Sequence, residues 1–150
     1  MQLGNMQLDL QHFAERLVAG MSEAIVCADA EGMIRYWNQG AARVFGFSRP
    51  EALGQPLDII IPQALRERHW QGYHATMRTG KSRYGEGHLL SVPAIRKDGT
   101  RLSVEFTIVP FTDNAGNMAG IAAVMRDATR SFEELRALRK KIAALESRTG

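Results

Sequence analysis

The 150-residue sequence lacks several features that mark other classes of protein. Cys27 is the single cysteine, so a disulfide within the chain and a metal site made of several cysteines are both excluded. No run approaches the ~20 apolar residues of a membrane span. The start has neither the basic residues nor the apolar stretch of a signal peptide. We therefore expect a cytoplasmic domain with no membrane segment in this chain. Cys27 lies in the apolar run AIVCADA, where we expect it to be a small buried side chain.

Excess positive charge is missing from most of the chain. Residues 1–125 carry 12 Lys/Arg and 12 Asp/Glu, whereas residues 126–150 carry 7 Lys/Arg and 4 Asp/Glu and so supply the whole net charge of +3. A domain that binds nucleic acid gathers its basic residues on a folded surface. The even balance over residues 1–125 therefore predicts that nucleic acid is not a partner.

Catalytic motifs are also absent from the sequence. It contains no Gly-x-Ser-x-Gly, no Walker phosphate loop, no His-Glu-x-x-His and no paired-carboxylate motif. We therefore expect a binding or signalling module rather than an enzyme, with any enzymatic output in another domain or partner.

What the sequence does contain is an ordered series of helix and strand patterns, at a length that suits one compact domain. Strand patterns occupy residues 23–30, 33–37, 86–96, 101–111 and 118–126. Helical patterns occupy residues 7–20, a short segment capped by Asn38, residues 62–80 and the C-terminal segment. Turns of hairpin length join neighbouring strands. This order predicts an α+β fold, with one five-stranded antiparallel sheet and helices on one face.

Three segments of the sequence resemble a PAS domain, namely EAIVCADAEGMIRYWNQGAARVFGFSRPEALGQPL, RKDGTRLSVEFTIVPF and GIAAVMRDATR. The resemblance makes residues 22–129 a PAS sensor domain, preceded by an amphipathic helix in residues 1–21 and followed by a coiled-coil signalling helix in residues 130–150. It implies a sheet that cups a ligand against its helices, and a sensor of small molecules, light or redox state. The reactive-cysteine motif of light-oxygen-voltage PAS domains is absent, which disfavours a flavin photosensor.

The helix expected over residues 62–80 further resembles the haem-binding PAS domains of the FixL type and the direct-oxygen-sensor type. In those domains a histidine eleven residues before a glycine ligates the haem iron, and His69 stands eleven residues before Gly80. Helical geometry places Gly72 and Tyr73 on the same face as His69. A glycine there would let a flat macrocycle approach the helix. We therefore predict a haem b cofactor with His69 as its proximal ligand.

Other interpretations of the two helix histidines remain open. His69 could instead be a core or edge histidine hydrogen-bonded to a neighbour. His74 lies about 140° around the helix from His69, so we expect it to point into solvent.

The resemblance also identifies positions on the distal side of the expected cofactor. Leu90 stands where the FixL-type pattern has an arginine, so stabilisation of bound oxygen by that residue is not expected. His88 stands where direct oxygen sensors place a methionine ligand, and it is either a second iron ligand or a strand-end residue. Phe106 falls at a distal aromatic position and shares a strand face with Ile108, so both are expected to line the pocket. We predict a sensor of redox state or of a diatomic gas such as carbon monoxide.

The C-terminal segment has apolar residues in a 3-4-3 spacing, at Leu135, Leu138, Ile142 and Leu145. This is the a/d pattern of a coiled coil, and it predicts a parallel homodimer that relays the signal to a histidine kinase or another output domain. The alternative is an amphipathic helix folded back onto the sheet. For the domain as a whole, the alternative is a dimerisation and relay module that binds no haem.

Overall fold

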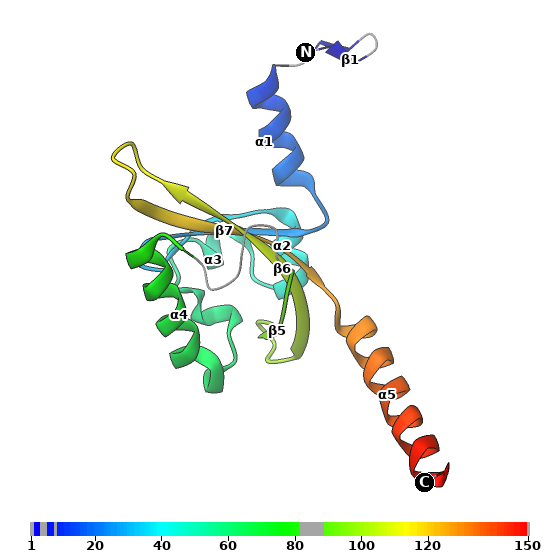
Figure 1. Ribbon diagram of the computed structural model, residues 1–150. Coiled ribbons are helices and arrows are strands. Elements are labelled where there is room, and N and C mark those ends of the chain that lie inside the picture. The colour runs from blue at the N-terminus through cyan, green and yellow to red at the C-terminus, as the bar shows by residue number, and fades with distance from the viewer. Residues whose placement is uncertain (1, 4–5, 8, 82–88, 150) are drawn as a thin grey trace.

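The computed structural model describes residues 2–3, 6–7, 9–81 and 89–149. At its centre is a five-stranded antiparallel sheet with the strand order β4-β3-β7-β6-β5 (Figure 1). The strands are β3 (Ala24–Asp29), β4 (Ile34–Trp37), β5 (Leu90–Ile95), β6 (Arg101–Thr112) and β7 (Met118–Asp127). The α+β architecture predicted from the order of patterns is therefore confirmed.

Helical elements cover one face of this sheet (Figure 1). They are α2 (Gln39–Phe45), α3 (Arg49–Ala52), the 3-10 turns η1 (Leu57–Ile60) and η2 (Gln63–Leu65), and α4 (Arg66–Thr79). Asn38 is the N-cap of α2, as predicted, and its side-chain oxygen accepts hydrogen bonds from the backbone of Ala41 at 2.9 Å and of Ile25 at 2.8 Å. The same side-chain oxygen thus ties the start of α2 to strand β3.

The hydrophobic core lies between the sheet and the short helices. Trp37 and Phe45 are fully buried, with ring centroids 5.6 Å apart. The Trp37 indole nitrogen donates to the backbone oxygen of Phe47 at 3.0 Å, which satisfies its polar edge. The core continues towards α4, because Val26 and Val104 are core residues that also line the cavity described below.

Several element boundaries differ from the sequence expectations. The first helix, α1, spans Leu10–Gly20 instead of beginning at residue 7, because the Asp9 side chain accepts from the backbone of Gln11 and caps the helix there. Two short strands, β1 (Gln2–Leu3) and β2 (Met6–Gln7), precede it and were not predicted. The α-helical part of α4 begins at Arg66, since the residues after Pro62 form the 3-10 turn η2.

Cys27 is another correction, because its side chain is half-buried instead of fully buried. Its strand neighbours Val26 and Ala28 face the helices and the cavity. Side chains alternate along a strand, so Cys27 faces the opposite side of the sheet, which the helices do not cover.

The two terminal helices extend from the domain in different directions (Figure 1). Neither α1 nor α5 (Thr129–Thr149) has a buried residue. The C-terminal helix is present as predicted, and it stands away from the sheet instead of folding back onto it (Figure 1). Within the described parts of the chain, no helix combines the length and the apolar character needed to cross a membrane.

Candidate functional site

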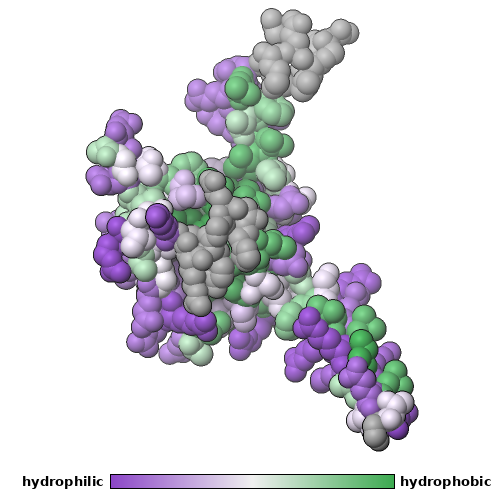
Figure 2. Space-filling model, viewed as in Figure 1, coloured by the Kyte–Doolittle hydropathy of each residue, from purple (hydrophilic) through white to green (hydrophobic). Residues whose placement is uncertain are grey.

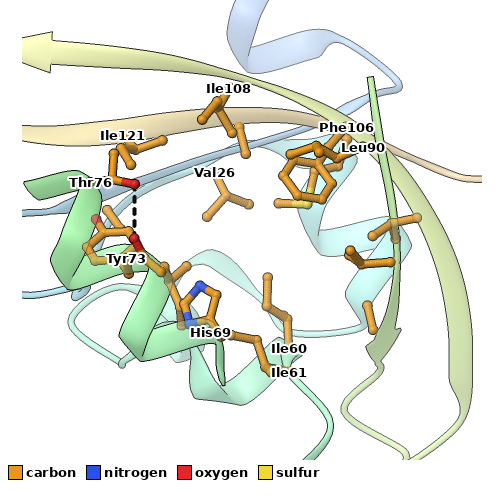
Figure 3. Close-up of a pocket in the computed structure, with 18 of the residues that line it drawn as sticks. Val26, Ile60, Ile61, His69, Tyr73, Thr76, Leu90, Phe106, Ile108 and Ile121 are labelled. Carbon is orange, nitrogen blue, oxygen red and sulfur yellow. Dashed lines mark hydrogen bonds between the residues drawn. The ribbon is translucent and has the colours of Figure 1, made fainter. Parts of the chain in front are cut away.

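A cavity of about 530 Å³ lies between α4 and the inner face of the sheet (Figure 3). This volume is in the range of small-molecule and cofactor sites. Its walls come from β3, β5, β6, β7, η1 and α4, and they are mostly apolar. Six of the apolar lining residues are Val26, Ile60, Leu90, Phe106, Ile108 and Ile121.

Strand register explains why these side chains meet. Leu90 of β5 is paired with Phe106 of β6, and Phe106 is paired with Met125 of β7. Ile108 is paired with Ala123 in the same way. Partners directly across an antiparallel pair point to the same face, so these residues form a continuous apolar floor beneath α4. The alternation predicted for residues 101–111 therefore builds the floor of the cavity.

His69 projects from α4 towards this floor, and one of its ring nitrogens is directed at the cavity (Figure 3). The other nitrogen, Nδ1, is buried and has no hydrogen-bond partner among the residues that the structure describes. Burial lowers the pKa of His69, and nearby His74 adds to this effect, whereas the carboxylate of Asp58 opposes it. The imidazole is therefore held in its neutral form, which is the form that ligates metals.

Tyr73 fixes the rotation of α4 over the sheet. Its hydroxyl donates to the backbone oxygen of Asp29, at the end of β3, over 2.5 Å. Burial raises the pKa of the Tyr73 phenol, so the group stays protonated and acts as a donor. One turn along α4, the Thr76 hydroxyl donates to the backbone oxygen of Gly72 at 2.9 Å (Figure 3).

Trp70 is a second anchor of α4, and sequence reasoning missed it. Its indole nitrogen donates to the Asp58 carboxylate of η1 at 2.7 Å. Its ring also lies so close to Gly32 that any Cβ at that position would collide with it. Gly32 additionally has φ of 79°, which favours glycine. The glycine in the β3–β4 turn was a visible signal, but nothing in the sequence tied it to a tryptophan on a distant helix.

The polar part of the cavity lining was also not predicted. Arg68 and Gln71 line it from α4, and Arg68 is the one charged side chain among its described lining residues. Both residues are also exposed to solvent. A ligand that combines an apolar body with a negatively charged end would therefore find both kinds of contact.

The structure brings together most of the residues singled out from the sequence. His69, Gly72, Tyr73, Leu90, Phe106 and Ile108 all line the cavity. A Cβ added to Gly72 would meet no atom within 4 Å, so the space beside it is open. His74 is exposed, as expected, and its ring stacks on Trp70 with centroids 5.7 Å apart. His88 lies outside the described residues, and its part in the site stays a prediction.

Clusters of metal-binding side chains are not a feature of the described chain. No group of three or more His, Cys, Asp or Glu side chains comes together in residues 9–81 and 89–149. A metal held by His69 would therefore arrive with ligands of its own, as the iron of a haem does.

Comparison with known proteins identifies the family. The PAS domain family model matches residues 22–130, and the chain belongs to this family of sensory modules. A solved PAS domain from Colwellia psychrerythraea has the same fold, with a TM-score of 0.71 at 23% identity, over 81% of this chain and 99% of that one.

Two curated relatives are named as sensors. The chain is 33% identical to the sensor protein FixL of Bradyrhizobium diazoefficiens over 86 residues, which is 57% of this chain and 17% of that protein. It is 26% identical to the oxygen sensor protein DosP of Escherichia coli over 113 residues, which is 75% of this chain and 14% of that protein. The chain thus spans less than a fifth of the length of either relative.

Proposed function

We propose that this sensory PAS domain binds haem b in the cavity beneath α4, with His69 as the iron ligand. One observation carries the proposal. His69 is the only imidazole among the described residues that line the apolar cavity, and one of its ring nitrogens is directed into that cavity (Figure 3). Imidazole is a common proximal ligand of haem iron.

The residues present fit this cofactor. Haem b is a flat apolar macrocycle with two carboxylate groups at one edge. The apolar floor of β5, β6 and β7 suits the macrocycle, and the open space beside Gly72 leaves room for its approach to α4. Arg68 and Gln71 would hold the carboxylates, since guanidinium and amide groups are donors for them.

When bound, haem would supply an iron centre that binds a diatomic gas or changes its oxidation state. This chain's own residues would tune that centre. Among the described residues, Leu90 and Phe106 form the wall opposite His69, and neither side chain can donate a hydrogen bond; a charged donor in their place would give a polar ligand about 1.5–3 kcal/mol of stabilisation. Redox or carbon monoxide sensing therefore suits this wall better than tight oxygen binding. The second iron ligand that the sequence predicts, His88, remains part of the proposal.

The signal would leave the domain through α5. Arg96, after β5, donates to the Asp127 carboxylate at 2.6 Å and to the backbone oxygen of Val44 at 3.0 Å. Asp127 in turn accepts at 2.9 Å from the backbone of Thr129, the first residue of α5. These contacts support a path from the sheet to the helix. We propose that α5 relays the signal within a homodimer to an output domain such as a histidine kinase, in line with the sensor relatives.

A haem titration followed by absorption spectroscopy tests the proposal. Wild-type protein should acquire a Soret band at a ratio of one haem per chain. His69→Ala should lose this band, whereas the matched control His74→Ala, a change on the exposed face of the same helix, should keep it. A featureless wild-type spectrum would instead support a PAS relay module that binds no haem, and unchanged spectra in both variants would remove His69 from the site.

A further inference from the structure

Helix α5 presents an apolar seam that no other described element covers. Its residues Leu135, Leu138, Ile142 and Leu145 are between 48% and 60% exposed. The seam runs along one side of the helix, bordered by charged residues, beyond the body of the domain (Figure 2). A helix of two heptads has marginal stability in water unless its apolar side is covered. We therefore expect a partner to cover this seam.

The charges beside the seam indicate what that partner is. With Leu135 and Ile142 at heptad position a, position g holds Glu134 and Lys141, and position e holds Arg139 and Glu146. Each flanking position therefore changes sign from one heptad to the next. Position g begins negative and becomes positive, whereas position e begins positive and becomes negative.

Two copies in a parallel, in-register pair would match these signs. In that arrangement each g residue faces the e residue five positions further along the other helix. Glu134 would face Arg139 of the second copy, and Lys141 would face Glu146 of the second copy. Because the pair is symmetric, each of these contacts occurs twice, and all of them join opposite charges.

An antiparallel pair centred on the same seam would not match them. It would bring position g against position g, and at the centre Lys141 would meet its own counterpart. Like charges in contact are unfavourable, so this orientation is selected against. Ile142 at position a with Leu145 at position d also favours a two-stranded parallel coil.

We propose that the partner of α5 is a second copy of this chain, held in a parallel register by the alternating charges at positions 134, 139, 141 and 146. The inference rests on the relay part of the proposed function and specifies its geometry. In the single chain Glu134 accepts from Arg130 at 3.1 Å, a pair that is largely exposed on both sides. That pair is weak, and a carboxylate has a second oxygen available for Arg139 of the second copy.

Charge-reversal substitutions in the full chain test directly whether the two α5 helices are parallel. Sedimentation equilibrium on the protein without haem should give a dimer for wild type, and Glu146→Lys should raise the dimer dissociation constant about tenfold by reversing two symmetric pairs. Adding Lys141→Glu to Glu146→Lys should restore wild-type affinity, because it recreates the g–e pair. Adding Arg139→Glu instead should not restore it.

The opposite results would overturn the proposal. Failure of Lys141→Glu to rescue Glu146→Lys would mean that positions 141 and 146 do not face each other in a parallel pair, and no effect of Glu146→Lys would mean that these charges do not select the partner. A wild-type chain that stays monomeric would mean that another protein covers the seam. Since these measurements need no haem, their failure would leave the haem titration of His69 to be judged separately.

Discussion

The hydroxyl of Tyr73 donates to the backbone oxygen of Asp29, across 44 residues of sequence, at 2.5 Å. This bond joins the middle of α4 to the end of β3. It sets the rotation of the helix, and His69, one turn earlier, therefore faces the apolar floor of the sheet. The position of His69, the candidate iron ligand, therefore depends on the hydrogen bond between Tyr73 and Asp29.

Replacing Tyr73 by phenylalanine should show how much this contact contributes. The ring would still fill its space, and the oxygen of Asp29 would keep its hydrogen bond from the backbone of Gly32. We expect a loss of about 0.5–1.5 kcal/mol in the free energy of unfolding, with a fall of about 2–4 °C in Tm per kcal/mol. Urea titration and thermal melting measure it. A variant as stable as wild type would mean that the bond does not hold α4.

Two substitutions of Gly72 separate the effect of helix propensity on stability from the effect of cavity space on haem binding. Gly72→Ala should raise the free energy of unfolding by about 0.5–1 kcal/mol, because alanine favours the helix and its Cβ meets nothing within 4 Å. Gly72→Leu should keep much of that gain but weaken haem binding at least tenfold, since its side chain competes for the open space. Equal haem affinity in both variants would show that the ligand does not pass close to position 72.

The stability of the protein should depend on pH through His69. Its pKa is lowered in the folded state by burial, so between the ordinary value of about 6.5 and the lowered value the unfolded chain binds a proton that the folded chain does not. The free energy of unfolding should therefore fall as pH is lowered through about 6.5, and level off below the folded pKa.

Urea titrations of wild type and His69→Gln at several pH values between 5 and 8 would isolate this contribution. The difference between the two proteins should change with pH in this window. Carboxylates with lowered pKa values, such as Glu51 at about 2, lose their contribution only at more acidic pH. Parallel curves for the two proteins would show that His69 has the same pKa folded and unfolded.

Local patterns were sufficient to predict the sheet and several of its connections. Strand β6 follows from its strict alternation, the α2 cap from Asn38, and the end of α4 from Gly80, whose φ of 71° suits glycine. The cavity walls then follow, because alternation fixes which residues face the helices. The position of His69 on the cavity side of α4 could be predicted because helix geometry places it on the inner face.

Contacts between distant segments could not be predicted in this way. Trp70 has no local signal for its role, since its partners Gly32 and Asp58 lie in two other elements. The burial of Cys27 was overestimated because an apolar run does not show that one face of its strand is left uncovered. No local pattern marks Arg68 and Gln71 as lining residues, because only the position of α4 brings them to the cavity.

Chemical rescue of the proposed ligand tests the central claim most directly. His69→Gly removes the imidazole and leaves a space of the same shape, which free imidazole can enter. Absorption spectra of this variant with haem should lose the wild-type bands, and millimolar imidazole should restore them, while methylated imidazole too large for the space should restore them less. A His69→Gly spectrum that already equals that of wild type, before any imidazole is added, would contradict ligation by His69.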